Sequence, residues 1–528
     1  MIKVLMTYNN TEGMDVLLNN KNFKIDIHSK PSPEKFAELI PEYDCLLIRS
    51  EVKVTPDIFK AAKNLKLVGR AGTGVDNVDL KAATEKGVIV MNVPGGNTIS
   101  ACEQTLALLL SMARNIPQAY SSLKKGEWKR EKFIGTELAG KTLGLIGLGR
   151  IGKEVAKRAL SFDMRVIVSD PFVSEDFIKS VGGNIELKQL DDVYKESDFI
   201  SIHTPKNEAT KNMINKNTIA KMKDGVRIIN CARGGIINEQ DLCDALKSGK
   251  VKTAALDVFE KEPPTDTKLL ELDNVIATPH LGASTEEAQI KIAEELSQMV
   301  IDYFERSIIR NAVNIPSVDS ETFRLLQPYI DLIEKIGLMQ GQVIEGGVKE
   351  INVEYSGEVA NMNVLLLTST YLKGFLAPIL DIKINFVNAS YIAKERGIKI
   401  KEIKNPDNGD YVSLISITVI TDKMELNVKG TMFSHNNPRV VAINGLDVDI
   451  LPAGNMIMIE NEDKPGVIGQ VGTILGENKI NIASMQVGRK KVSGGAITIV
   501  TVDSKPEEAV MSKLSRINGV SKVKMIVL

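Results

Sequence analysis

Residues 140–170 read GKTLGLIGLGRIGKEVAKRALSFDMRVIVSD, and this stretch decides the fold of the chain. The apolar run at residues 143–146 is typical of a buried parallel strand, and it leads into a G-x-G-x-x-G motif at the start of a predicted helix. The first glycine allows a tight turn, the second lets the backbone approach a pyrophosphate, and the third lets helix and strand pack closely. The free N–H groups at the helix start face the anion. The three glycines of the motif are Gly147, Gly149 and Gly152.

The acidic residue that follows this unit indicates which dinucleotide binds. A second predicted strand, residues 166–168, ends next to Asp170, which comes 18 residues after Gly152. That spacing is close to the roughly 20 residues expected for the acid that hydrogen-bonds an adenosine ribose. Because a carboxylate would repel a 2′-phosphate, we expect NAD as the cofactor rather than NADP.

Composition excludes several classes of partner. At about 150 residues per domain, the 528 residues suggest three or four domains. Sixty-six basic and sixty-seven acidic residues give a net charge of −1 without long blocks of one sign, so we expect no nucleic-acid partner and no anionic-membrane partner. The four cysteines have neither metal nor redox spacing, so we expect no metal site and no disulfide. The chain lacks a signal-like N-terminus and any apolar run of about 18 residues, and we expect a soluble, cytoplasmic protein.

The order of predicted strands and helices divides the chain into four parts. Residues 1–96 alternate short apolar strands with helices and form an α/β lobe of their own. Residues 97–284 form the dinucleotide-binding lobe, which opens with a long helix crossing between the lobes. A helix near residues 284–303 leads back, so that residues 285–316 complete the first lobe. A cleft between two Rossmann-like lobes follows from this arrangement.

The remaining chain has a different character. Residues 317–452 combine a helix with strands of period two, which indicates an α+β module. Residues 453–528 show the βαββαβ order of a ferredoxin-like domain. The predicted fold class is therefore α/β, with two Rossmann-like lobes followed by an α+β domain and a ferredoxin-like domain.

Three chemically distinct side chains follow neighbouring strands of the dinucleotide-binding lobe. Arg233, Glu262 and His280 each come just after a predicted strand, at the edge where open parallel sheets bind ligands. An arginine fork can grip the carboxylate of an α-hydroxy acid, and a histidine can exchange the C2 hydroxyl proton while hydride moves to or from the nicotinamide. Glu262 would orient the ring and favour its protonated form. Each residue alone could be a solvated charge or a structural group, but their convergence favours an active site. The remaining histidines are expected to be structural: His28, His203 and His435.

The first lobe carries two arginines at strand ends, Arg49 and Arg70. They fit a substrate with a second anionic group, although surface ion pairs would place arginines there too. Their surroundings, IRS at residues 48–50 and GRAGTGVDN at residues 69–77, and the motifs above resemble the D-isomer-specific 2-hydroxyacid dehydrogenases. The resemblance covers the whole chain, and it points to the long members of that family that act on 3-phospho-D-glycerate.

The resemblance implies roles for further residues. It places Arg49 and Arg70 at the substrate phosphate and implies a dimer built through the cofactor lobes, commonly assembled into a tetramer. The other residues implied at the substrate are Thr73, Gly74 and Val75 near the carboxylate, Asn97 at the start of the crossing helix, and Arg130 reaching the neighbouring subunit's substrate. Those implied at NAD are Arg150 and Ile151 at the pyrophosphate, Thr204 beside the adenosine half, and Ala232 and Asp257 near the nicotinamide amide.

The last two parts resemble the family's intervening domain and an ACT domain, the amino-acid-sensing regulatory fold. Asn461 and Asp463 lie in a polar loop before a predicted helix, and Asn481 opens the next strand. We expect these two points to lie close together at a domain edge and to bind L-serine as a feedback inhibitor, with two subunits sharing the site. Alternatively, Asp463 simply caps the helix.

The sequence therefore predicts an NAD-dependent oxidation of 3-phospho-D-glycerate to 3-phosphooxypyruvate, the first step of L-serine biosynthesis. One alternative is a relative that reduces glyoxylate, hydroxypyruvate or 2-oxoglutarate. Another is a nucleotide-sensing corepressor of the same fold, in which binding rather than turnover matters. The arginines of the first lobe disfavour the former, and the intact Arg233, Glu262 and His280 disfavour the latter.

Overall fold

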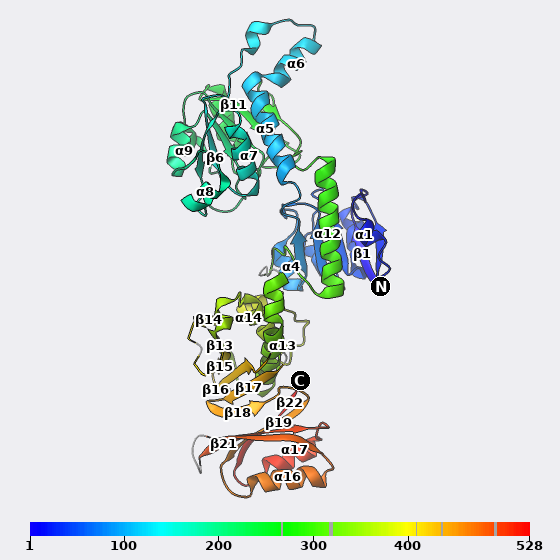
Figure 1. Ribbon diagram of the computed structural model, residues 1–528. Coiled ribbons are helices and arrows are strands. Elements are labelled where there is room, and N and C mark those ends of the chain that lie inside the picture. Colours follow the sequence, from blue (N-terminus) through cyan, green and yellow to red (C-terminus); the bar gives the residue numbers. More distant parts are fainter. Residues whose placement is uncertain (266–267, 316–319, 408, 435–436, 490–493) are drawn as a thin grey trace.

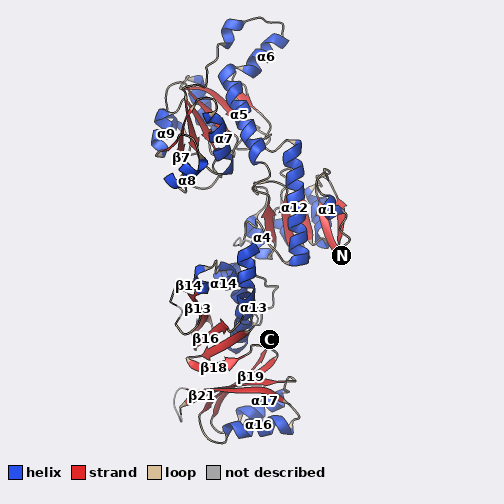
Figure 2. Cartoon of the chain, viewed as in Figure 1, coloured by secondary structure: helices blue, strands red, loops and turns tan. Residues whose placement is uncertain are grey.

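The computed structural model describes residues 1–528 except 266–267, 316–319, 408, 435–436 and 490–493. In this described part the strands form four sheets, which follow one another along an elongated molecule (Figures 1 and 2). The lobe that carries the N-terminus lies between the dinucleotide-binding lobe and the last two sheets. The expected boundary at residues 316–317 and His435 lie outside the described residues. None of the helices that the structure describes is both long and apolar enough to span a bilayer.

The first lobe is built on a five-stranded parallel sheet with the order β2-β1-β3-β4-β5. Its strands are β1 (Ile2–Met6), β2 (Phe23–Ile27), β3 (Cys45–Ile48), β4 (Leu67–Arg70) and β5 (Ile89–Asn92). Its helices are α1 (Asp15–Leu18), α2 (Pro33–Leu39), α3 (Pro56–Ala61) and α4 (Leu80–Lys86), with the short η1 (Ile40–Glu42). Successive residues of one strand serve opposite faces. Leu46 packs with Phe36 and Phe59 on one side, and Leu47 packs with Leu296 of α12 (Glu286–Arg306) on the other. Both faces of the sheet are therefore covered, as a parallel sheet requires.

The second lobe is built on a seven-stranded parallel sheet with the order β12-β11-β10-β9-β6-β7-β8. Its strands are β6 (Thr142–Ile146), β7 (Arg165–Ser169), β8 (Ile185–Leu187), β9 (Phe199–Ile202), β10 (Val226–Asn230), β11 (Val251–Leu256) and β12 (Val275–Ala277). Its helices are α5 (Thr98–Arg114), α6 (Ile116–Lys124), η2 (Arg130–Phe133), α7 (Arg150–Leu160), α8 (Glu175–Val181), α9 (Leu190–Glu196), α10 (Lys216–Ala220) and α11 (Glu239–Lys247). In Figure 1, α5 leads into α6, which projects from the body of the lobe.

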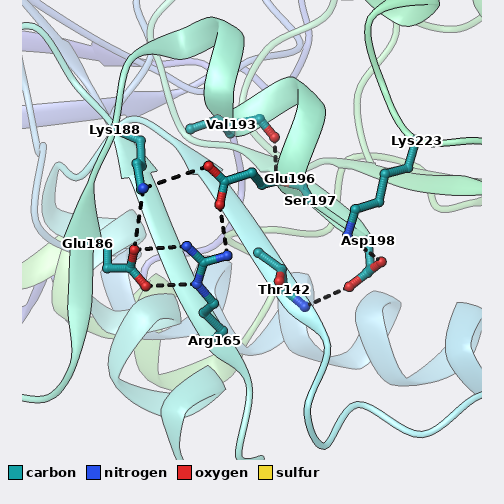
Figure 3. A network of polar contacts seen from close by, with 9 residues as sticks. All are labelled: Thr142, Arg165, Glu186, Lys188, Val193, Glu196, Ser197, Asp198 and Lys223. Atoms are coloured by element: carbon teal, nitrogen blue, oxygen red, sulfur yellow. Dashed lines mark hydrogen bonds and ion pairs between the residues drawn. The ribbon is translucent and has the colours of Figure 1, made fainter.

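The amino-terminal edge of this second sheet is tied by charged side chains (Figure 3). Arg165 at the start of β7 contacts both carboxylate oxygens of Glu186 at 2.7 and 2.8 Å and the carboxylate of Glu196 at 2.8 Å. Lys188 completes the group. Hydrogen bonds from Arg165 hold the pKa of both glutamates below the usual range. This network lies at the edge opposite to the carboxyl ends of the strands, so it fastens β7, β8 and α9 without entering the cleft.

The last two sheets share an apolar core. The third sheet is mixed, with the order β14-β13-β15-β16-β17-β18, and the fourth is antiparallel, with the order β20-β21-β19-β22. Met456, Ile499 and Ile526 of the fourth sheet join the core of the third. The third part contains α13 (Ser320–Val343), β13 (Val348–Gly357), η3 (Glu358–Asn361), α14 (Leu365–Leu376), α15 (Ala389–Glu395), β14 (Lys399–Asn405), β15 (Ser413–Thr421), β16 (Glu425–Met432), β17 (Pro438–Ile443) and β18 (Leu446–Ile450). The fourth contains β19 (Asn455–Glu462), α16 (Val467–Glu477), β20 (Ile482–Arg489), β21 (Gly495–Val502), α17 (Glu508–Ser515) and β22 (Val520–Val527). The predicted fold class is confirmed, including the βαββαβ order at the end of the chain.

Side-chain amides join the third part to its neighbours at both ends. Gln342 at the end of α13 donates to the carbonyl of Val527 and accepts from its N–H, each at 3.0 Å, so the side chain pairs with β22 as a strand residue would. At the other end, Asn385 Nδ2 donates to the carbonyl of Gly87 at 2.7 Å, and the Tyr391 hydroxyl donates to Glu85 at 2.6 Å. The third part is thereby attached both to the first lobe and to the last domain.

A fully buried amide holds α13 against the third sheet. Gln340 Nε2 donates to the carbonyls of Ile417 and Leu426 at 3.1 and 3.0 Å, and its Oε1 accepts from the Tyr371 hydroxyl at 2.8 Å. One buried side chain thus bonds three buried groups. Because a buried polar group that loses its partner is costly, we expect this amide to stabilise the packing of α13 on the sheet.

The substitution Gln340→Leu should weaken this region, because it removes three buried hydrogen bonds and leaves the Tyr371 hydroxyl without this partner, at about 1–3 kcal/mol for that group. Amide hydrogen exchange in peptides from β15 and β16 should become faster. Gln240→Leu, at an exposed position of α11, is the matched control and should leave that exchange unchanged. Unaltered protection of both strands in the Gln340 variant would show that the amide contributes no net stability.

Candidate active site

A cleft of about 590 Å³ lies between the first two lobes and receives side chains from both. Arg49 and Arg70 reach it from the first lobe, and Arg233, Glu262 and His280 reach it from the second. Arg49 follows β3 and Arg70 ends β4, while the others follow β10, β11 and β12, so all five stand at or beyond the carboxyl ends of parallel strands. The structure therefore brings together the residues that the sequence singled out for chemistry.

The glycine turn has the shape that a pyrophosphate requires. Gly147 has φ +98°, and a Cβ there would lie 2.7 Å from the carbonyl of His203, while a Cβ on Gly152 would lie 2.3 Å from the carbonyl of Gly147. No atom would obstruct a Cβ on Gly149, so the backbone there faces open space at the start of α7. These are the three separate roles expected of the motif.

The residues expected at the adenosine half surround this turn. Asp170 accepts from the N–H of Leu148 in the turn at 2.8 Å and from that of Phe172 at 2.9 Å. The hydroxyl of Thr204 is buried at the cleft and has no partner among the described residues. A buried hydroxyl left unpaired beside an unobstructed glycine turn fits a bound dinucleotide. Ile151 also lines the cleft, and Arg150 Nη1 crosses to the first lobe and donates to the carbonyl of Pro94 at 3.2 Å.

Glu262 and His280 form a tight pair. His280 Nδ1 lies 2.7 Å from Glu262 Oε2, and Glu262 Oε1 accepts from the N–H of Phe259 at 3.0 Å. Partial burial raises the pKa of Glu262, but the hydrogen bonds from His280 and Phe259 and the charge of Arg233 outweigh it and leave that pKa below the usual value. The carboxylate is therefore ionised at neutral pH, and Nε2 is the ring nitrogen available to a substrate.

Asp257 holds the loop that carries His280. It is fully buried, and its oxygens accept from the N–H groups of Leu281 at 2.8 Å and Gly282 at 2.9 Å and from the hydroxyl of Thr278 at 2.5 Å. His280 itself has φ +56°, a conformation that non-glycine residues adopt only when their surroundings impose it. The family resemblance implies that Asp257 lies near the nicotinamide amide, and in the structure its carboxylate holds the loop that carries His280.

Arg233 is held by groups from both lobes. Its Nη1 donates to the carbonyl of Ala232 at 2.7 Å, and its Nε lies 3.1 Å from Oδ2 of Asp76 in the first lobe. Asn230 fixes the turn by donating to the carbonyl of Arg233 and accepting from the N–H of Ala232. Sequence reasoning missed Asp76, although it stands inside the segment GTGVDN.

The two arginines of the first lobe lie in different surroundings. Arg49 stacks over the ring of Tyr8, 4.7 Å from its centroid, and reaches Gln289 of α12 at 3.4 Å. Arg70 donates to the carbonyl of Ala71 at 3.2 Å, and its Nε is buried without a partner in the described part of the chain. Burial first, and then the charge of Arg233, lower the pKa of Arg70 to about 10. A cluster of cations with an unpaired donor is suited to an anion.

The remaining residues expected at the substrate divide into two groups. Thr73 Oγ1 donates to Asn97 Oδ1 at 2.7 Å, which ties the first-lobe loop to the residue before α5, and Gly74 lines the cleft. Val75 packs beneath the loop in the core of the first lobe. Arg130 lies exposed in η2, outside the residues that line the cleft, so a single chain does not bring it to the site.

The serine-site residues do not meet within one chain. Asn461 is buried and accepts from Thr498 at 3.0 Å, and Asp463 pairs with Arg489 at 2.9 Å. Asn481 donates to Asp503 at 2.6 Å at the start of β20. In β21, Ala496 pairs with Asn461 and Val502 pairs with Ile482, so the two points stand at opposite ends of the sheet, about 20 Å apart by the usual strand rise. The expectation that they lie close together in one domain is wrong, because β19 and β20 run parallel on either side of β21.

Three family profiles match the chain. The profile of the D-isomer specific 2-hydroxyacid dehydrogenase NAD binding domain matches residues 106–282. That of the D-3-phosphoglycerate dehydrogenase intervening domain matches residues 325–444, and that of the ACT domain matches residues 455–519.

Individual proteins show the same relationship. The D-3-phosphoglycerate dehydrogenase of Bacillus subtilis is 46% identical over 484 residues, which cover 92% of this chain and 92% of that protein. The D-3-phosphoglycerate dehydrogenase of Archaeoglobus fulgidus is 43% identical over 512 residues and covers 96% of each chain. Among solved structures, a D-lactate dehydrogenase from Aquifex aeolicus complexed with NAD and lactic acid is 29% identical, with a TM-score of 0.53, and covers 60% of this chain and all of that chain.

The substitution Asp257→Asn should loosen the His280 loop, because an amide offers one acceptor oxygen where the carboxylate offers two. Hydrogen bonds to a charged group stabilise by about 1.5–3 kcal/mol, so the amides of Leu281 and Gly282 should exchange roughly tenfold faster or more. Hydrogen-exchange mass spectrometry of the peptide covering residues 278–284 measures this. Asp198→Asn, which removes a carboxylate that accepts from the Thr142 N–H at the opposite edge of the sheet, is the control. Equal exchange of the loop in both variants would contradict the assignment.

Proposed function

Because the chain belongs to the D-isomer-specific 2-hydroxyacid dehydrogenase family, among its long members named D-3-phosphoglycerate dehydrogenases, we propose that it oxidises 3-phospho-D-glycerate to 3-phosphooxypyruvate with NAD. This is the first step of L-serine biosynthesis. The observation that carries the proposal is the Glu262–His280 pair, which shares one cleft with Arg233, Arg49 and Arg70 beside a dinucleotide turn. The chain is an NAD-dependent oxidoreductase.

The second lobe supplies the groups that would hold NAD. The turn at Gly147, Gly149 and Gly152 would offer its N–H groups to the pyrophosphate, and Asp170, which accepts from the turn, would accept a hydrogen bond from a ribose hydroxyl. Thr204 offers its unpaired hydroxyl. When bound, NAD accepts the hydride from C2 of the hydroxy acid. Further residues of this proposed site are Arg150, Ile151, Ala232 and Asp257, the last acting through the His280 loop.

The substrate carries two anionic groups, and the cleft offers cations for both. Arg49 and Arg70 of the first lobe would hold the phosphate, and Arg233 of the second lobe would hold the carboxylate. The backbone near Thr73 and Gly74, which line the same cleft, would lie near the carboxylate. A substrate held at both ends would bridge the two lobes, which sets C2 in a fixed place relative to His280.

His280 would take the C2 hydroxyl proton as the hydride leaves. Its Nδ1 is committed to Glu262, so Nε2 receives the proton, and the ionised Glu262 stabilises the positive ring that forms. The roles are those of a general base and the carboxylate that orients it. Held 2.7 Å from the carboxylate, the ring keeps one orientation throughout the proton transfer.

We also propose how the chain assembles and how it is regulated, on the basis of the family resemblance. Tyr120, Leu123 and Trp128 of the projecting segment after α5 are exposed apolar side chains, which a second copy would cover in a dimer. The dimer would also carry Arg130 toward the neighbouring cleft. The ACT domain implies an amino-acid effector, and we propose L-serine, bound between Asn461 and Asp463 of one copy and Asn481 of another.

The proposed reaction is tested by a panel of hydroxy acids with NAD, read by NADH absorbance, with 3-phospho-D-glycerate expected to be the best substrate. His280→Ala should lower kcat by roughly 10²–10⁴-fold, the usual contribution of a positioned base, with little change in NAD affinity. His28→Ala removes an exposed histidine and is the control. Turnover by the His280 variant near that of the control would reject the assigned base.

Arg49→Ala and Arg70→Ala should discriminate between substrates. Each removes a charged hydrogen bond of about 1.5–3 kcal/mol, so the KM for 3-phospho-D-glycerate should rise about 10- to 100-fold. The KM for an unphosphorylated hydroxy acid should change much less. Arg516→Ala, an exposed arginine of the last domain, controls for loss of a cation outside the cleft. Equal increases for both substrates would place these arginines outside the phosphate site.

L-Serine should bind the assembled protein and inhibit it. Because the proposed site needs residues from two copies, Asn481→Ala should abolish the heat of serine binding in calorimetry and relieve the inhibition. Asn478→Ala, at the end of α16, is the matched control for loss of a nearby amide. Serine binding that survives Asn481→Ala unchanged would remove this site, and absence of inhibition by serine would remove the regulatory role alone.

A further inference from the structure

One carboxylate of the first lobe reaches across the cleft to the second. Asp76 Oδ2 lies 3.1 Å from Arg233 Nε, and the Asp76 side chain is 70% exposed whereas that of Arg233 is 28% exposed. Asp76 contacts the Nε side of the Arg233 guanidinium. Nη1 donates to the carbonyl of Ala232, so these two contacts engage Nε and Nη1 of a guanidinium that has five N–H donors.

The loop that carries Asp76 is rigidly attached to the first lobe. The side chain of Asn77 donates to the carbonyls of Arg49 at 2.8 Å and Val52 at 2.6 Å, and its own carbonyl accepts from the N–H of Val54 at 2.8 Å. Asp76 is thereby presented to the cleft from a fixed backbone.

The guanidinium of Arg233 also lies directly against this loop. A Cβ on Gly74 would stand 2.3 Å from Arg233 Nη2 and 3.0 Å from Asp76 Oδ2. Only a residue without a side chain leaves room for the arginine there. Gly74 and Asp76 of the first lobe therefore form the surface against which the Arg233 side chain of the second lobe packs.

Arg233 lies near a second cation, Arg70, as well as near the carboxylate of Glu262. The charge of Arg233 lowers the pKa of Arg70, and the charge of Asp76 opposes that effect. A flexible arginine facing a second cation has no reason to remain in one orientation without a counter-charge. Asp76 supplies that counter-charge at the point where the two lobes meet.

We propose that Asp76 is a positioning residue, whose carboxylate holds the Nε edge of Arg233 across the cleft so that the Nη edge is presented to the substrate carboxylate. The inference rests on the proposed function for the identity of the substrate. Asp76 carries the same sign of charge as the substrate, so it does not attract it. Its contribution lies in the orientation of Arg233, and it should appear in turnover rather than in substrate affinity.

The test is a comparison of kcat and KM for 3-phospho-D-glycerate in three variants. Asp76→Asn should lower kcat by about 10- to 100-fold without raising KM, because a misplaced group of this kind costs up to about 10² in rate while a less negative cleft still attracts the anion. Asp76→Glu keeps the charge within reach of Arg233 and should recover most of the lost kcat. Glu51→Gln removes one negative charge from the same cleft without touching Arg233, and its effect on KM gives the size of the charge effect alone.

Several outcomes would overturn the inference. These are an unchanged kcat in Asp76→Asn, an equal loss of kcat in Glu51→Gln, a rise in KM larger than the fall in kcat, and an Asp76→Glu variant no better than Asp76→Asn. Because Asp76 is mostly exposed, melting curves should show all variants folded. Wild-type protein that fails to oxidise 3-phospho-D-glycerate would reject the proposed function instead, and the same comparison is then made with glyoxylate or hydroxypyruvate and NADH.

Discussion

Gly282 links the segment where the chain enters the second lobe to the segment where it leaves that lobe. Its N–H donates to Asp257 and its carbonyl accepts from the hydroxyl of Ser100, each at 2.9 Å. Ser100 lies in the first turn of α5, where the chain enters the second lobe, and Gly282 lies where the chain leaves it. His280 stands just before this point, so the same contacts hold the segment that carries its ring beside the start of α5.

Most of the fold could be predicted because it depends on residues adjacent in sequence. The apolar run before Gly147 and the glycine spacing determine a strand, a turn and a helix whatever surrounds them. Two edge strands lack such an apolar run. β8 has only three residues, and β2 alternates apolar with charged residues at the rim of its sheet. Their pairing is decided by the neighbouring strand rather than by their own sequence.

The residues of the candidate site that follow parallel strands could be predicted, because the carboxyl ends of those strands meet at one edge of the sheet. Glu262 and His280 follow the neighbouring strands β11 and β12, and His280 Nδ1 lies 2.7 Å from Glu262 Oε2. Contacts between separate units were not predictable in this way. Asp76 meets Arg233 only because the lobes face each other, and the distance from Asn461 to Asn481 depends on the strand order of a whole domain.

Because Gln342 pairs with β22, both the length of helix α13 and the direction in which its last turn faces determine how the last domain is attached. One added residue would advance the end of the helix by 1.5 Å and turn it by about 100°, which would carry the amide away from Val527. Only insertions close to whole turns would return a side chain to that strand, and they would push the last domain outward by about 5 Å for each turn. The distance between the last domain and the first lobe can therefore change only in steps of about one helical turn if this pairing is to be kept.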